Sequence, residues 1–242
     1  MDKKTKKSSS VVDVNAAKAS RIEGFLKAKD EMNSIRLMLS LPNGCNYLVD
    51  GKTPIFCYAL ENDMLTLCSA ILNDSDFSPN ALIDDGCTPI SQALFIDTFD
   101  DAYPIWKRKL YFGLLDKMLR HKNTDFTLLS KGKDEVHASL LMLMAETKGV
   151  SIITGSDDYF PYILEIAVRK ALDAGNYNKL FYVDEDGYSF VSHALQEGNF
   201  KFIKKISEIL PDYKLSEMDY NMVENKLNIL RRLKVNYNNK EK

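Results

Sequence analysis

The sequence has few of the residues on which catalysis and metal binding usually depend. It contains three histidines, one tryptophan and four cysteines in 242 residues, and no two cysteines are spaced as C-x-x-C. No H-E-x-x-H, H-x-H or G-x-x-x-x-G-K motif occurs. These absences leave a zinc site, a phosphate-binding loop and a cysteine redox motif without support, and we expect no cofactor.

Long apolar runs and an excess of one charge are also lacking. No apolar run reaches the length of a membrane-spanning helix, and the N-terminus has no apolar signal-peptide core, so we expect no membrane partner. The formal net charge is −2, so the chain as a whole offers no field that attracts nucleic acid, and we expect no nucleic-acid partner. Cys57 and Cys68 stand among apolar residues, and we interpret them as reduced core thiols.

What the chain does contain is an internal repeat. Residues 50–55 read DGKTPI, residues 85–90 read DGCTPI, and a weaker copy at 186–191 reads DGYSFV. Self-similarity of this kind is typical of stacked repeat proteins. The turn glycines at 51, 86, 132 and 187 are 35, 46 and 55 residues apart. Regular arrays step by about 33 residues, so the later units contain insertions, mainly between their two helices.

The repeat motif predicts a tight turn followed by a capped helix. Glycine accepts the turn conformation, Thr53 is placed to cap the next helix, and Pro54 suits its first position. Helical periodicity predicts an inner and an outer helix in each of the first three units, at 54–62 and 64–73, 89–96 and 105–121, and 136–147 and 160–174. Trp106 is interpreted as a core residue, and His137 as lying inside an inner helix.

The segments that flank the repeats are predicted to be helical caps. Apolar residues between 14 and 41 predict one long or two short helices, weakly broken at Gly24. The domain prediction is a disordered basic tail over 1–13, an N-terminal cap over 14–45, repeats over 46–210, and a C-terminal cap and tail over 211–242. The simpler interpretation of the first ten residues is a disordered, solvated segment. The alternative is a signal that is recognised by a secretion machine.

On these motifs the chain resembles ankyrin repeat proteins from about residue 46 to residue 210. The resemblance implies an all-α fold, a helical solenoid of about four repeats with N- and C-terminal helical caps. Turns and inner helices would then form a concave face, and partners usually bind there. The chain departs from the family pattern where Phe56 and Ser91 stand in place of its histidine, and where Thr-Pro is lost in the third and fourth units.

The expected function is that of a protein-interaction module: an adaptor, an inhibitor or a secreted effector, monomeric when free. One rival is an enzyme or enzyme-modulating effector whose site is formed by the insertions 97–104 and 148–158. Another is a structural cap domain of a larger repeat protein. Frequent Lys, Asn, Ile and Tyr indicate an A·T-rich coding source such as a bacterial accessory gene, a phage or a virus. We expect a cytoplasmic protein, with delivery into a host cell as the alternative.

The candidate partner-binding residues are acidic turn tips and exposed ends of inner helices. Turns favour Asp because its side chain bonds nearby backbone amides, and this accounts for part of the acidity. The remaining acids would steer a partner with a basic surface. The expected surface consists of Asp50, Lys52, Glu61, Asn62, Asp84, Asp85, Asp184, Glu185, Asp186, Tyr188, Gln196 and Glu197. A secondary candidate is the insertion with Phe99, Asp100, Asp101 and Tyr103. No catalytic or metal-binding residue is expected.

Overall fold

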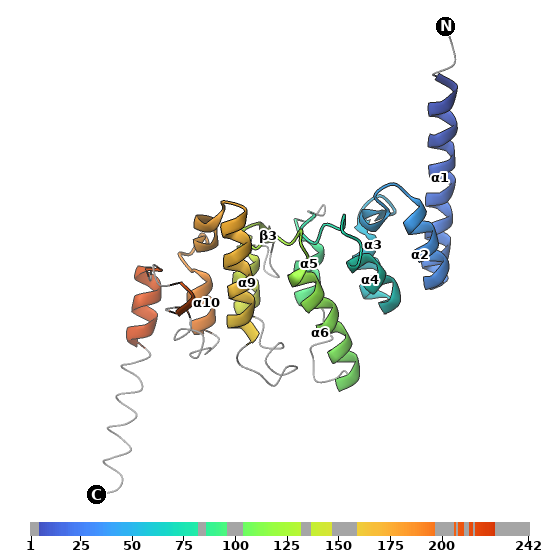
Figure 1. Ribbon diagram of the computed structural model, residues 1–242. Helices are drawn as coiled ribbons and strands as arrows, with labels where there is room; N and C mark the ends of the chain where they lie inside the picture. The colour runs from blue at the N-terminus through green and yellow to red at the C-terminus, as the bar shows by residue number, and fades with distance from the viewer. Residues whose placement is uncertain are drawn as a thin grey trace, which may run out of the picture. The chain divides into compact units, whose positions relative to one another are not determined.

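The described residues are mostly helical, which confirms the predicted all-α class at that level (Figure 1). The computed structural model describes residues 5–81, 86–95, 104–131, 137–146, 159–196, 206, 208–210, 213–214 and 216–225. Within these residues, strands occur only in two short antiparallel hairpins. The chain divides into two units, 1–96 with 109–124 and 97–108 with 125–242.

The first unit begins with two packed helices, α1 (Thr5–Lys27) and α2 (Glu31–Ser40). The chain turns at Lys29, which has a φ of 55°, and Asp30 caps α2 by accepting a hydrogen bond from the Asn33 amide at 3.2 Å. The break therefore lies after Gly24, which stays inside α1. α1 begins at Thr5 and so overlaps most of the predicted tail over 1–13. A helix that has nucleated extends at little further cost.

The first repeat contains η1 (Gly44–Asn46), β1 (Leu48–Val49), β2 (Thr53–Pro54), α3 (Ile55–Glu61) and α4 (Leu65–Leu72). Both helices agree with their predicted ranges to within a residue. The predicted cap is wrong, because Thr53 pairs with Val49 in the hairpin and no side chain caps α3. Phe56 stands at the third position after Thr53 and offers no hydroxyl with which to complete a reciprocal cap.

The second repeat forms the cap that the first one lacks. The Thr88 amide donates to Ser91 Oγ at 2.8 Å, and the Ser91 amide donates to Thr88 Oγ1 at 3.1 Å. Pro89 opens α5 (Pro89–Phe95), as predicted. The next helix, α6 (Ile105–Arg120), also has its predicted range. Trp106 is 63% exposed, so its assignment to the core is wrong. It lies on the side of α6 opposite the buried residues, which are Tyr111, Leu114, Leu115, Met118 and Leu119.

The loop over residues 74–78 is held by side chains from both of its neighbouring segments. Asn46 donates to the Asp76 carbonyl and accepts from the Ser78 amide, each at 2.8 Å. Asn123 donates to the carbonyls of Ser75 and Phe77 at 2.9 and 2.7 Å. His121 Nε2 lies 3.0 Å from the Asp74 carbonyl. Irregular backbone is thereby given the hydrogen-bond partners that a helix would supply.

The core of the first unit is built around aromatic and aliphatic side chains of these helices. The rings of Phe56 and Phe77 lie 5.4 Å apart, and the Phe77 ring meets His121 edge-on at 5.7 Å. Cys57 and Cys68 are buried thiols, as predicted. Burial raises the pKa of the Cys68 thiol well above its ordinary value, with Glu31 as the next cause.

The second unit contains β3 (Leu129–Lys131), β4 (His137–Ser139), α7 (Leu140–Glu146), α9 (Tyr159–Asp173), η3 (Tyr177–Phe181) and α10 (Phe190–Gln196). The helix predicted over 136–147 begins only at Leu140. His137 is therefore in a strand rather than in a helix, because its backbone pairs with Lys131 in the β3–β4 hairpin.

The helices of the second unit pack around α7, whose residues 140–145 are all buried. Such a uniformly apolar helix needs cover on every side. α10 and α9 both contact it. The predicted end of α9 at Gly175 is confirmed: Gly175 has a φ of 69°, and the Asn176 amide donates to the Ala171 carbonyl at 2.8 Å.

Candidate partner-binding surfaces

The turn of the first repeat presents Asp50 and Lys52 as exposed side chains. Asp50 and Gly51 have φ values of 51° and 72°, so two consecutive residues take the left-handed conformation. The turn is tied to α1, because Glu23 Oε1 accepts from the Asp50 amide at 3.2 Å and from the Tyr47 hydroxyl at 2.9 Å. Lys27 lies 4.0 Å from the Asp50 carboxylate in an exposed pair that contributes little stability.

The turn at residues 184–188 uses one of the predicted surface acids internally. Asp184 Oδ1 accepts from the amides of Asp186 at 3.0 Å and Tyr188 at 2.8 Å, and Oδ2 lies 3.3 Å from His193 Nε2. Only 7% of the Asp184 side chain is exposed. The prediction that Asp184 belongs to an accessible acidic tip is therefore wrong, because its carboxylate closes the turn. Glu185 and Asp186 are exposed.

Tyr188 follows the turn glycine and is half-buried. Its ring lies 5.9 Å from the ring of His193 in α10. Part of the ring therefore packs on the repeat while part stays accessible to solvent. A ring held in this way loses little conformational freedom on binding, which suits an anchor residue.

The ends of two inner helices carry the remaining described candidates. Glu61 is exposed at the end of α3, and Gln196 is exposed at the end of α10. Asn62 is half-buried: its amide group donates to the Tyr58 carbonyl at 2.9 Å, and its own carbonyl accepts from Lys29 at 3.3 Å. Asn62 therefore ends α3 and offers less of its side chain to a partner than Glu61 does.

Several predicted residues lie outside the described part of the chain. These are Asp84, Asp85, Glu197 and the secondary candidates Phe99, Asp100, Asp101 and Tyr103. The insertion 148–158 and all of 97–104 except Pro104 also lie outside it.

A polar cluster around Asp219 was not predicted. This fully buried carboxylate accepts hydrogen bonds from the hydroxyls of Ser189 at 2.8 Å, Ser192, and Tyr213 at 3.1 Å. It also accepts from the Ser216 amide at 2.9 Å, while the Asp219 amide donates to Ser216 Oγ. The S-x-x-D spacing of residues 216–219 marks a helix start, but no local signal shows that the carboxylate also reaches the cap of α10.

The electrostatics of this cluster favour the ionised carboxylate. Burial alone would raise the pKa of Asp219, but hydrogen bonds from Ser192, Ser216 and Ser189 hold it below its ordinary value. Burial raises the pKa of Tyr213 far above its ordinary value, and the Asp219 charge adds to the shift. The phenol therefore stays protonated and donates, and the cluster fixes the helical residues 217–225 to the start of α10.

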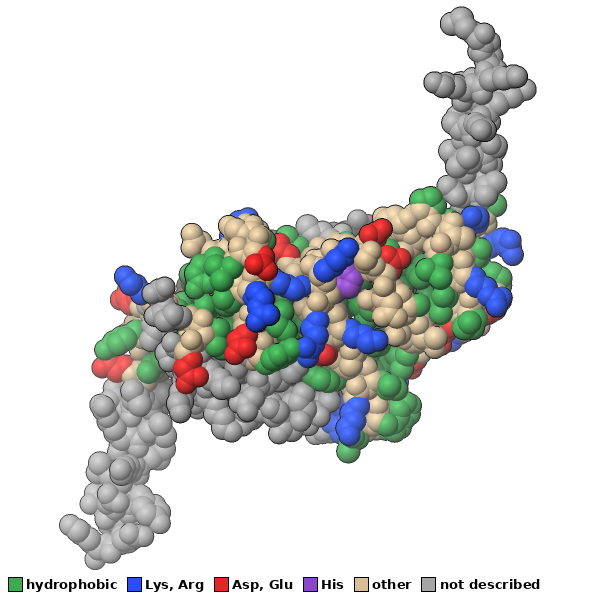
Figure 2. Space-filling model, viewed as in Figure 1, with side chains coloured by type: hydrophobic (Ala, Val, Ile, Leu, Met, Phe, Trp, Pro, Cys, Tyr) green, Lys and Arg blue, Asp and Glu red, His purple; other side chains and the backbone are tan. Residues whose placement is uncertain are grey.

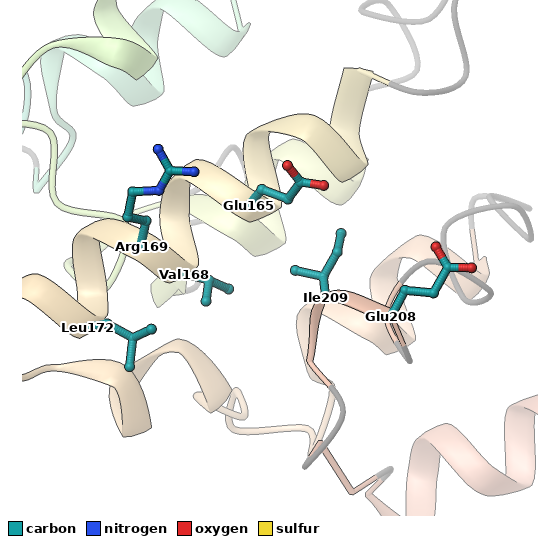
Figure 3. Close-up of a pocket in the computed structure, with 6 residues that line it drawn as sticks. All are labelled: Glu165, Val168, Arg169, Leu172, Glu208 and Ile209. Atoms are coloured by element: carbon teal, nitrogen blue, oxygen red, sulfur yellow. The ribbon is translucent and has the colours of Figure 1, made fainter.

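A groove of about 470 Å³ lies beside α9 in the second unit (Figure 3). Its described lining comprises Glu165, Val168, Arg169, Leu172, Glu208 and Ile209. The four α9 residues are three or four positions apart and share one face of the helix. Val168 and Ile209 point toward each other across the groove. Its apolar floor thus has carboxylates and a guanidinium at the edges, and the predicted site includes none of these residues.

Comparison with models of protein families, with curated protein sequences and with solved structures finds no match for this chain. Within the described ranges, no helix is both long enough and apolar enough to cross a membrane. The same residues contain no group of three His, Cys, Asp or Glu side chains that could hold a metal ion.

Proposed function

We propose that the chain is an ankyrin-type repeat module that acts by binding another protein, as an adaptor, an inhibitor or a secreted effector. The observation that carries the proposal is the recurrence of one local structure. Gly51, Gly86 and Gly187 have φ values of 72°, 82° and 86°. An inner helix begins three or four residues after each of them, at Ile55, Pro89 and Phe190. Repeats of this kind present surfaces on rigid scaffolds.

The proposed contacts lie at exposed turn tips and adjacent helix ends in each of the two units, taken separately. Asp50, Glu185 and Asp186 supply negative charge, with Tyr188 as an aromatic anchor. Their backbones are fixed by the turn hydrogen bonds, so a partner can be contacted without disturbing the core. The acids favour a partner with a basic surface, because opposite charges steer association. We place this activity in the cytoplasm, either of the producing cell or of a host cell into which the protein is delivered.

The test is capture of the partner from the organism that encodes the chain, followed by measurement of the association rate. Reversing the charges with Asp50→Lys, Glu185→Lys and Asp186→Lys should slow association and reduce its dependence on salt. The matched control reverses three other exposed acids, Asp173, Glu217 and Glu224, and should leave the rate nearly unchanged. A second variant replaces residues 97–104 by a two-residue turn. If the triple charge-reversal variant keeps the partner and this second variant loses it, the insertion is the binding site.

A further inference from the structure

The solvent-facing side of α6 carries cations and large apolar side chains. Its exposed residues include a set spaced three or four apart: Trp106, Lys109, Leu110, Gly113, Lys117 and Arg120. We call this set the α6 outer face, and its spacing places it along one side of a single helix. Figure 2 shows Lys and Arg side chains along α6, with hydrophobic side chains at its lower end. The one acid of α6, Asp116, is only partly exposed and pairs with Arg120 at 2.8 Å.

The apolar part of this face is large for a helix open to solvent. Trp106 is 63% exposed, and Leu110, one turn further on, is 50% exposed. Two large side chains at i and i+4 are a common anchor pair where one helix packs on another. Lys117 Nζ donates to Ser69 Oγ at 3.4 Å, so its ammonium group lies beside α4, which contains Ser69.

Gly113 lies at the centre of the outer face and is not required by the fold. Its φ is not left-handed, and an added Cβ would meet nothing within 4 Å. Glycine destabilises a helix interior relative to alanine, so the position costs stability without an internal reason. A missing side chain on an exposed face permits another backbone to approach closely. Gly24 in α1 has the same local freedom, but its neighbours Ser20, Arg21 and Lys27 include no large apolar side chain.

The chemistry of the face selects among possible occupants. A second α6 outer face would bring cations against cations, so pairing of two copies through this face is disfavoured. A nucleic acid would use the cations and could stack on Trp106, but it would leave Leu110 and the Gly113 gap without a role. An anionic membrane would use the cations and the apolar pair, but it has no backbone to fit over Gly113.

We propose that the α6 outer face binds an acidic helical segment of a partner protein, whose backbone crosses α6 at Gly113. The apolar residues of that segment pack on Trp106 and Leu110, and its carboxylates pair with Lys109, Lys117 and Arg120. This surface has the opposite charge to the turn tips and does not depend on the function proposed for them.

A library of displayed helical peptides with randomised surface positions, selected on the full-length protein, tests the proposal. Selected peptides should be rich in Asp and Glu and carry apolar residues at helical spacing. Trp106 is the only tryptophan in the chain, so binding should shift its emission to shorter wavelengths. Gly113→Leu and the double variant Lys109→Glu with Lys117→Glu should each weaken binding tenfold or more. The matched control Gly24→Leu should bind as the wild type does.

The proposal is overturned if no peptide is selected, or if the selected peptides lack acids or bind Gly113→Leu at full strength. It is also overturned if a thymidine oligonucleotide or phosphatidylserine vesicles bind this face more tightly than the selected peptides. Circular dichroism checks that each variant is folded. Should Gly113→Leu unfold the protein, Gly113→Ala replaces it, with a smaller loss of affinity expected.

Discussion

At the scale of single residues, side-chain chemistry decides which acids remain available on the surface. Asp184 and Asp186 belong to the same turn, yet the Asp184 carboxylate accepts hydrogen bonds from backbone amides, whereas Asp186 is exposed. The sequence predicts acid at this turn but does not indicate this division, which depends on the backbone path and on His193. The Asp219 cluster was missed for a similar reason. Ser189 and Asp219 are 30 positions apart, so no local sequence pattern indicates that their side chains meet.

Replacing Gly51 or Gly86 with Val should destabilise the protein by roughly 1–3 kcal/mol, because a β-branched residue resists a left-handed backbone. Around Gly51 an added Cβ would meet nothing within 4 Å, so the cost there is conformational rather than steric. Urea denaturation of each variant measures the change. Wild-type stability in both variants would contradict the placement of the turns.

Asp219→Asn should destabilise the protein by roughly 1–3 kcal/mol at pH 7, because an amide group cannot accept all the hydrogen bonds that the carboxylate accepts. The pKa of Asp219 is lowered by folding, so its contribution is present above its unfolded pKa of about 3.9 and is lost as the pH falls through the folded value. Urea midpoints should therefore differ at neutral pH and begin to converge as the pH falls below about 4. An equal difference at both pH values would show that the carboxylate charge is not responsible.

At the scale of elements, the sequence predicts helix ranges well and local pairing poorly. α5 and α6 agree with their predicted ranges because Pro89 and the periodicity of 105–121 are local signals. His137 and Thr53 were misassigned because hairpin pairing competes with helix formation and depends on another segment. Trp106 shows a third limit, since a helical pattern identifies an apolar residue but not the side of the helix that is covered.

The helix caps differ between repeats in a way that mutation can test. Thr88→Ala should cost about 1 kcal/mol, because it removes the acceptor for the Ser91 amide at the start of α5. Thr53→Ala should cost less, because no side chain caps α3. Thermal melting of the two variants compares the sites directly, and equal losses would contradict the assigned difference.

Gly113→Ala and Gly24→Ala should each stabilise the protein by roughly 0.5–1 kcal/mol, since both glycines are inside helices and have open space for a Cβ. Chemical denaturation measures the effect. Destabilisation by either variant would reveal a close contact that the structure does not show.

At the scale of the whole molecule, the two units share one kind of construction. Each combines a hairpin or tight turn with antiparallel helices and a buried apolar helix face. The far-ultraviolet circular dichroism spectrum should accordingly be dominated by helix. A spectrum dominated by β-structure would contradict this fold.

The side-chain hydrogen bonds that hold residues 74–78 limit where the chain can gain or lose residues. Four successive carbonyls there, from Asp74 to Phe77, are engaged by side chains of His121, Asn46 and Asn123. An added or deleted residue would move these carbonyls away from their partners, so we expect this loop to tolerate neither insertion nor deletion. The insertions that lengthen the later repeats accordingly lie between the two helices of a repeat and not in the loop 74–78. Among homologous chains we expect the loop 74–78 to keep its length, and we expect insertions and deletions to occur in the connections between the two helices of a repeat.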